Sequence, residues 1–373
     1  MTDSSPSRFG LVGTGWRADF FLRLAAALPS RFKVAAVATR DPAKGAAIEI
    51  AWPVPTVRST DDLISKYRPD FVVASVNRVA TPEVIETCVQ RGMPVLAETP
   101  PALHLAAMRE LWSRLSQPEL VQVAEQYPYL PRLQALRALI DAGRLGDVTA
   151  AEVSWTHDYH AVAMLRSLLA AGFRAATVTA QAFTAPVTES LGRAGWPDRT
   201  VLTDVTRTIA LLNFGDLLGV YDFTDSQWFH PLMGRRLTVR GTSGEVIDDR
   251  VTTLLDSRTP VTATLARRQT GIDGDLEGFD LDTIALGFDV LYRNPFQGAR
   301  LSDEEIAIAT VLDRMAGWVR GAAAPPYPLA QACQDHVLAL AIAEAARESQ
   351  PVTVSSEAWA APPTVRRRAS SGW

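Results

Sequence analysis

A short apolar run near the start of the chain leads into a glycine-rich turn, and the turn opens a segment with helical spacing. The run covers residues 9–12, the turn holds Gly13, Thr14 and Gly15, and apolar side chains then recur up to Leu28. The free N–H groups and the dipole of a helix that starts at such a turn attract phosphate groups. This order of strand, turn and helix therefore predicts a dinucleotide-binding site at the start of a parallel sheet.

The residues of the turn have separate roles in such a site. Gly13 allows the tight turn, Gly15 lets the backbone approach a pyrophosphate, and Ala18 lets the helix pack closely on the strand. Trp16 and Arg17 stand inside the turn, and we expect them to flank the pyrophosphate. The alternative is that both side chains face solvent.

Length and charge bound the class of protein. A chain of 373 residues is too long for one core, so two domains are expected. Its net charge of −4 gives no basic field to hold nucleic acid. No apolar stretch resembles a signal peptide or reaches the ~18 residues of a membrane span. Cys88 and Cys333 lie far apart in the sequence and lack metal-ligand spacing, which suits a reducing cytoplasm. Together these features predict a cytoplasmic protein without a metal, membrane or nucleic-acid partner.

Strand-like and helix-like segments alternate through the first third of the chain. The expected strands are 9–12, 32–37, 70–76, 94–97 and 120–124, and helical segments lie between them. This alternation predicts an α/β fold with a doubly wound parallel sheet, a Rossmann domain, over residues 1–126.

The pattern changes after a predicted helix at 132–142. From residue 148 the chain has longer strands joined by short loops, and a long helix is expected at 329–348. Such runs of strands predict an α+β domain with an open, mainly antiparallel sheet over residues 127–373. An open sheet face usually needs covering, so we expect a homodimer or homotetramer.

Four short motifs occur in a fixed order along the chain. They are Ala-Thr-Arg-Asp-Pro at 38–42, Pro-Val-Leu-Ala-Glu-Thr-Pro at 94–100, Ala-Glu-Gln-Tyr at 124–127 and Gly-Thr-Ser-Gly-Glu at 241–245. With the glycine turn, this set resembles the glucose–fructose oxidoreductase, inositol dehydrogenase and MocA family of nicotinamide-dependent oxidoreductases. The resemblance implies that NAD or NADP binds in the first domain and that a sugar, polyol or related small molecule binds against the open sheet. It also implies hydride transfer between a substrate carbon and the nicotinamide.

The catalytic motifs depart from that family. Its fifth strand normally ends in Glu-Lys-Pro, with the lysine near the reacting hydroxyl, whereas this chain has Glu-Thr-Pro at 98–100. Threonine cannot act as a cationic acid, and it does not readily take up a proton near neutral pH. If His160 takes the place of the family's histidine, Thr156 and Ala163 stand where the family has aspartates.

A cluster of reactive side chains, Thr-His-Asp-Tyr-His at 156–160, stands at a predicted junction of strand and helix. In one interpretation a histidine here carries the proton, because an imidazole titrates near neutral pH. His160 is preferred since it aligns with the family's histidine, and His157 is the second choice. Asp158 then orients a neighbouring ring, and Tyr127 supplies a hydroxyl from the opposite wall.

The other interpretation of this cluster is structural. Asp158 is then the N-cap of a helix at 160–169, and the two histidines are surface residues. Of the remaining histidines, His230 and His336 have no predicted role in a reaction. His104 follows Glu-Thr-Pro closely and is a minor option to replace the missing lysine, because it is expected on a helix.

Further cofactor contacts follow from the resemblance. It places Glu98 beside the nicotinamide, and Ser75 and Asn77 along the cofactor cleft. After the second strand the chain has Thr39 and Arg40 in place of the acidic residue typical of NAD sites. Arginine binds a 2′-phosphate well, which slightly favours NADP, but it can also stack on the adenine of either dinucleotide.

The leading hypothesis is therefore an NAD(P)-dependent dehydrogenase that acts on a secondary hydroxyl or ketone of a sugar, polyol or glycoside. The missing lysine leaves an imine reductase as an alternative, because reduction of a C=N bond needs less from such a group. The loss of both the lysine and the aspartates also leaves a cofactor-binding regulator without turnover.

Overall fold

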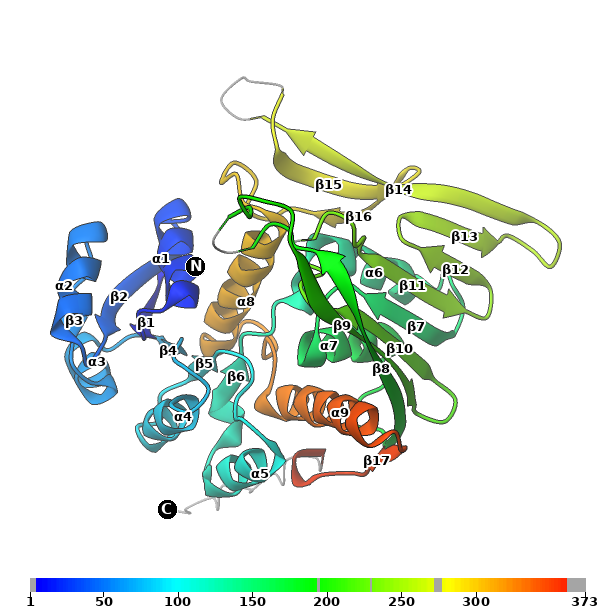
Figure 1. Cartoon of the computed structure of the whole chain (residues 1–373). Helices are drawn as coiled ribbons and strands as arrows, with labels where there is room; N and C mark the ends of the chain where they lie inside the picture. The colour runs from blue at the N-terminus through cyan, green and yellow to red at the C-terminus, as the bar shows by residue number, and fades with distance from the viewer. Residues whose placement is uncertain (1–4, 193–194, 229, 272–276, 361–373) are drawn as a thin grey trace, which may run out of the picture.

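A computed structural model describes residues 5–192, 195–228, 230–271 and 277–360 of the chain. These residues form two sheets, one of six strands and one of eleven, with helices packed against both (Figure 1). Within the described ranges, no helix is both long and apolar enough to cross a lipid bilayer.

The first sheet is parallel throughout, with the strand order β3-β2-β1-β4-β5-β6. Its elements are β1 (Ser7–Val12), α1 (Trp16–Ala27), β2 (Phe32–Ala38), α2 (Pro42–Ala51), β3 (Thr56–Val57), α3 (Thr60–Tyr67), β4 (Phe71–Ala74), α4 (Thr81–Gln90), β5 (Val95–Ala97), α5 (Leu105–Arg114), η1 (Pro118–Leu120) and β6 (Val121–Val123). The predicted doubly wound sheet is confirmed. Its strand order reverses between β1 and β4, and at such a point the carboxyl ends of the strands leave a crevice for a ligand.

The second sheet has the order β16-β15-β14-β13-β12-β11-β7-β10-β9-β8-β17. Only the β7–β10 pair is parallel among its described neighbours, so the mainly antiparallel prediction is confirmed. The elements are η2 (Tyr127–Tyr129), α6 (Pro131–Asp141), β7 (Val148–Ser154), α7 (Asp158–Leu169), β8 (Ala176–Thr188), β9 (Leu202–Asn213), β10 (Leu218–Thr224), β11 (Arg236–Gly241), β12 (Gly244–Ile247), β13 (Arg250–Leu254), β14 (Pro260–Thr270), β15 (Asp280–Leu286), β16 (Asp289–Arg293), α8 (Asp303–Val319), α9 (Leu329–Glu348), β17 (Val352–Val354) and η3 (Ala358–Ala360).

Helices cover one face of this second sheet. α7 packs on β7 and β10, α9 on β8 and β17, and α6 on β15 and β16 (Figure 1). The opposite face carries exposed apolar side chains, among them Phe183, Ile209 and Leu211, which are 69%, 42% and 44% exposed. This pattern agrees with the expected oligomer, which stays a prediction.

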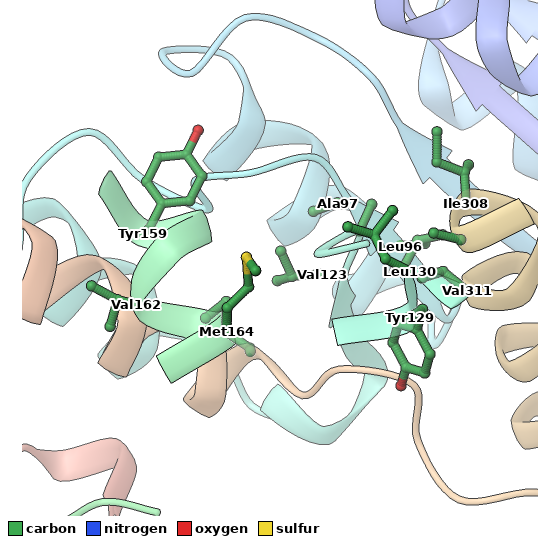
Figure 2. Packing of buried hydrophobic residues seen from close by; sticks show 14 of the residues in the cluster. Leu96, Ala97, Val123, Tyr129, Leu130, Tyr159, Val162, Met164, Ile308 and Val311 are labelled. Atoms are coloured by element: carbon green, nitrogen blue, oxygen red, sulfur yellow. The ribbon is translucent and has the colours of Figure 1, made fainter. Parts of the chain in front are cut away.

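The two sheets share one continuous apolar core. Leu96, Ala97 and Val123 of the first sheet belong to the same buried cluster as Val162 and Met164 of α7 (Figure 2). The chain also returns to the first sheet near its end, because Val123 N–H donates to the Tyr327 carbonyl at 2.8 Å. The domain boundary after residue 126 stays a proposal. Close to it, α8 packs on η2, α9 on β6 and η3 on α5.

Candidate functional site

The glycine turn has the geometry of a phosphate cradle. Gly13 adopts φ +112°, and a Cβ there would stand 2.0 Å from the Ser75 carbonyl oxygen, so only glycine fits. Gly15 is the N-cap of α1 without a side-chain cap, and a Cβ there would meet no protein atom within 4 Å. Ala18, in the first turn of α1, is fully buried. The first turn of α1 therefore presents uncapped N–H groups at an open surface, which fits a pyrophosphate.

A cleft of about 2070 Å³ runs from this turn to the start of α7. All the predicted site residues except Asp158 line it, namely Gly13, Thr14, Gly15, Trp16, Arg17, Thr39, Arg40, Ser75, Asn77, Glu98, Tyr127, His157 and His160. The structure thus brings the predicted cofactor residues and the predicted catalytic residues onto one cleft. Within the described ranges, no group of three or more His, Cys, Asp or Glu side chains is arranged to hold a metal ion.

Arg17 is tied to two carboxylates in this cleft. Its Nε donates to Glu98 Oε1 at 3.1 Å, and its Nη1 donates to Glu304 Oε1 at 3.0 Å. Burial alone would lower the pKa of Arg17, but the two carboxylates raise it. Trp16 is 57% exposed on the cleft wall. Arg17 therefore does not face solvent, and the position of both side chains beside a pyrophosphate stays a prediction.

Positive charge gathers beyond the end of β2. Arg40, Lys44 and Arg58 line the cleft there with Thr39, and no carboxylate of the described residues lies within 4.0 Å of these cations. Asp41 is the N-cap of α2, where its Oδ1 accepts the N–H groups of Ala43 and Lys44 at 2.9 and 3.3 Å. This end of the cleft therefore offers a dinucleotide three cations, beside the carboxylates of Asp41, Asp61 and Glu83.

Asn77 uses its side-chain oxygen within the protein. Its Oδ1 accepts the N–H groups of Val79 and Ala80 at 3.1 and 3.0 Å and so orders the approach to α4. Ser75 N–H donates to the Val12 carbonyl at 2.8 Å. Both residues line the cleft, as the resemblance implies, and their contact with a cofactor stays a prediction.

His160 is held by a buried carboxylate that sequence analysis did not single out. Its Nδ1 lies 2.7 Å from Oε2 of Glu125, a residue only 1% exposed. Oε1 of the same carboxylate accepts the Tyr127 N–H at 3.1 Å, so the carboxylate is fixed at both oxygens. With the Nδ1 proton directed at Glu125, the Nε2 lone pair of His160 is left to receive a proton in the cleft.

Other rings surround His160. The ring centroids of Tyr159, Tyr127 and His157 lie 4.4, 4.7 and 5.3 Å from its own. Burial raises the pKa of both tyrosines to about 12, so each hydroxyl stays protonated at neutral pH and can donate a hydrogen bond. His157 Nδ1 lies 2.9 Å from Asp158 Oδ2, which places a carboxylate on the second imidazole too.

The prediction that Asp158 caps a helix is wrong. Helix α7 begins at Asp158 itself, its N-cap residue is His157, and no side chain caps it. Asp158 adopts φ +47° and bonds the His157 ring, because the imidazole competes with the helix N–H groups for the carboxylate. The two positions that lack the family's aspartates, Thr156 and Ala163, are fully buried.

Glu125 and Tyr159, both beside His160, are among the site residues that sequence analysis missed. Glu125 follows the sixth parallel strand, and its position at the carboxyl end of that strand was the sequence signal that could have identified it. The three other histidines bond backbone groups: His104 Nδ1 caps α5, His230 Nε2 bonds the Thr188 carbonyl, and His336 Nε2 bonds the Leu103 carbonyl.

Comparison with known proteins identifies the first domain. Residues 7–125 match the GFO_IDH_MocA family, described as an oxidoreductase family with an NAD-binding Rossmann fold. The match covers the first sheet and the helices around it. A nicotinamide dinucleotide is therefore the cofactor class of the glycine turn and its cleft.

Curated relatives match part of the chain. An uncharacterized protein of Saccharomyces cerevisiae is 29% identical over 159 residues, 41% of this chain and 44% of that protein. The mouse trans-1,2-dihydrobenzene-1,2-diol dehydrogenase is 28% identical over 156 residues, 40% of this chain and 46% of that protein. The chain thus matches less than half the length of either relative.

Solved structures match nearly the whole chain. An oxidoreductase of Agrobacterium radiobacter in complex with NAD+, L-tartaric acid and magnesium has a TM-score of 0.65 at 13% identity, covering 93% of this chain and 98% of that one. A myo-inositol dehydrogenase of Corynebacterium glutamicum has a TM-score of 0.64 at 15% identity, covering 94% and 100%. At these identities the likeness establishes the shared two-sheet fold.

Proposed function

We propose that this protein is an NAD(P)-dependent dehydrogenase that transfers hydride between the nicotinamide and a secondary hydroxyl or ketone of a sugar, polyol or related ring alcohol. The observation that carries the proposal is the buried Glu125 at 2.7 Å from His160, on the wall of the cleft that begins at the glycine turn. The relative that acts on a diol and the solved structure named as an inositol dehydrogenase support the same reaction class.

Different residues of the cleft have different roles in this reaction. The nicotinamide, when bound, accepts or donates the hydride. The Gly13–Gly15 turn and the N-terminus of α1 hold the pyrophosphate, and the Arg17–Glu98 pair lies farther along the same wall. His160 Nε2 takes the alcohol proton during oxidation and returns it during reduction. Glu125 stabilises the imidazolium formed in between, and the tyrosine hydroxyls orient the substrate oxygen.

Removing the proton carrier tests this assignment. We expect His160→Ala to lower kcat by about 10²–10⁴-fold while the dissociation constant of the dinucleotide changes little, because the imidazole acts on the substrate. The rate is followed by nicotinamide absorbance with a panel of sugars, polyols and ring diols. His104→Ala is the control, since that ring caps α5.

Two outcomes contradict the proposal. Unchanged turnover in both His160→Ala and His157→Ala would remove the histidines from the reaction. A protein that binds the dinucleotide but turns over no alcohol, ketone or cyclic imine would be a regulator.

We also infer a preference for NADP over NAD. Arg40, Lys44 and Arg58 line the adenosine end of the cleft, and Asp41 uses its Oδ1 there to cap α2. Guanidinium and ammonium groups suit a 2′-phosphate, whereas an NAD site normally offers a carboxylate to the ribose hydroxyl.

A further inference from the structure

A small cavity adjoins the cleft beside the Glu125–His160 pair. Its volume is about 10 Å³, and Thr99 and Tyr159 line both the cavity and the cleft. Carboxylates from two distant parts of the chain line it, since Glu125 follows β6 and Asp335 belongs to α9. Pro100, Pro101 and Ala332 complete the lining.

The size and the lining of this cavity suit one water molecule. A space of about 10–15 Å³ is the smallest that holds a water, which also needs two to four polar partners. Glu125 and Asp335 offer acceptors, and the side chains of Thr99 and Tyr159 carry hydroxyl donors. A water that donates to both carboxylates offsets part of the cost of two negative charges buried near each other.

Asp335 is a buried carboxylate, 2% exposed, with a partner at each oxygen. Arg166 Nη1 donates to its Oδ1, and the Tyr327 hydroxyl donates to its Oδ2 at 2.5 Å. Burial raises the pKa of this carboxyl group to about 6, and the charge of Glu125 adds to the rise, while Arg166 and Tyr327 act against it. Asp335 therefore takes up a proton as the pH falls through about 6.

Arg166 has further partners besides Asp335. Its Nε donates to the Gly172 carbonyl at 3.1 Å, and its Nη1 and Nη2 donate to the carbonyl and the Oε1 of Gln331 at 3.1 and 2.7 Å. Its guanidinium also lies 5.6 Å from the centroid of the Phe173 ring. These contacts hold the guanidinium in place when Asp335 loses its charge, so the charge of Asp335 can change within the folded protein.

Resting on the proposed function, we propose that one buried water in this cavity joins Glu125 to Asp335, and that Asp335 acts through Glu125 to set how readily His160 takes up a proton. While Asp335 is ionised, two carboxylates favour the imidazolium that forms when the alcohol gives up its proton. Once Asp335 is protonated, Glu125 alone does so. Asp335 is therefore a positioning residue, because it acts on the reaction through another side chain.

Other titratable groups lie at the two ends of this network. Cys333 is beside Asp335 on α9, and burial raises the pKa of its thiol, so that it stays neutral. A substitution at Asp335 leaves in place the groups around His160, which are Tyr127, Tyr159, His157 and Asp158.

Histidine NMR on the full chain tests this coupling without a substrate. The titration of the His160 imidazole is followed, and its resonance is assigned by its loss in His160→Ala. We expect Asp335→Asn to lower the titration midpoint by about 0.5–1 pH unit, because a nearby negative charge is removed. Tyr327→Phe should lower it by less, since Asp335 without that hydroxyl keeps its proton to higher pH.

Asp282→Asn is the matched control for these variants. It removes another buried carboxylate that pairs with an arginine, and Asp282 lines neither the cleft nor the cavity. The His160 midpoint should stay unchanged in this variant. A crystal structure that resolves ordered waters should show one between the carboxylates of Glu125 and Asp335.

The coupling and the turnover fail separately in this design. A cavity without a water, or a His160 midpoint that stays the same in folded Asp335→Asn and Tyr327→Phe, would overturn the inference even if turnover depends on His160. A lowered midpoint in a protein that turns over no alcohol or ketone would instead overturn the proposed function and keep the coupling between these groups. Thermal unfolding midpoints check that each variant is folded.

Discussion

The carboxylate of Glu125 is almost fully removed from water and still has a partner for each oxygen. A buried charge is tolerated only when it is paired and hydrogen-bonded, and the His160 ring and the Tyr127 N–H supply both needs. The same contacts fix the orientation of the imidazole. Glu125 is therefore a positioning residue, since it acts through His160.

Glu125→Gln keeps the size of this side chain and removes its charge. We expect kcat to fall by about 10–100-fold, by analogy with the loss of a carboxylate that orients a histidine, with little change in KM or in dinucleotide affinity. Glu125→Asp should recover part of the rate. A proportional loss of folded protein and activity, without a selective fall in kcat, would show that Glu125 is only structural.

Substitutions at Gly13 and Gly15 separate the stability of the turn from its binding of the dinucleotide. Gly13→Ala places a Cβ against the Ser75 carbonyl and forces a positive φ, so we expect a loss of about 1–3 kcal/mol in the free energy of unfolding. Gly15→Ala meets no protein atom and should leave stability nearly unchanged, but its methyl group intrudes where the pyrophosphate approaches. Denaturant unfolding and dinucleotide titration measure the two effects. Equal dinucleotide affinity in Gly15→Ala and the parent would remove the pyrophosphate from this turn.

At the scale of elements, the end of β2, the start of α2 and the segment after β3 bring three cations together. Arg58 Nη1 donates to the Thr39 carbonyl oxygen at 3.4 Å. We expect Arg58→Ala to weaken NADP+ binding about tenfold and NAD+ binding much less, because a charged hydrogen bond to the 2′-phosphate is lost. Fluorescence titration of both dinucleotides measures the ratio, and equal losses for the two would contradict the NADP preference.

Elements with a clear period were predicted well, and pairings between elements were not. The expected helix at 329–348 is α9 with the same bounds, and the capping box of Ser302 and Glu305 at α8 was also predictable from their spacing. Strand β3 has two residues, too few to show a period. The Glu125–His160 contact joins residues 35 apart in the sequence, so it depends on how α7 packs against η2.

At the scale of the whole molecule, the uncovered face of the second sheet predicts association between copies of the chain. Exposed Phe183, Ile209 and Leu211 on β8 and β9 form apolar surface that a partner would bury. We expect light scattering to give at least twice the mass of one chain. Ile209→Glu should shift that mass toward the single chain, because it places a charge on this surface. A parent protein that is monomeric at micromolar concentration would contradict the prediction.

The hydrogen bond from Val123 N–H to the Tyr327 carbonyl joins the first sheet to a segment far along the chain. β6 is an edge strand of the first sheet, and the segment at 327–328 covers its outer side through this bond and the Gln122–Pro328 bridge. An uncovered edge of this kind invites pairing with other chains and aggregation. The dinucleotide domain therefore completes its own sheet only after more than 300 residues of chain have been made. The cofactor cleft and the distant C-terminal helices are in this sense one folding unit.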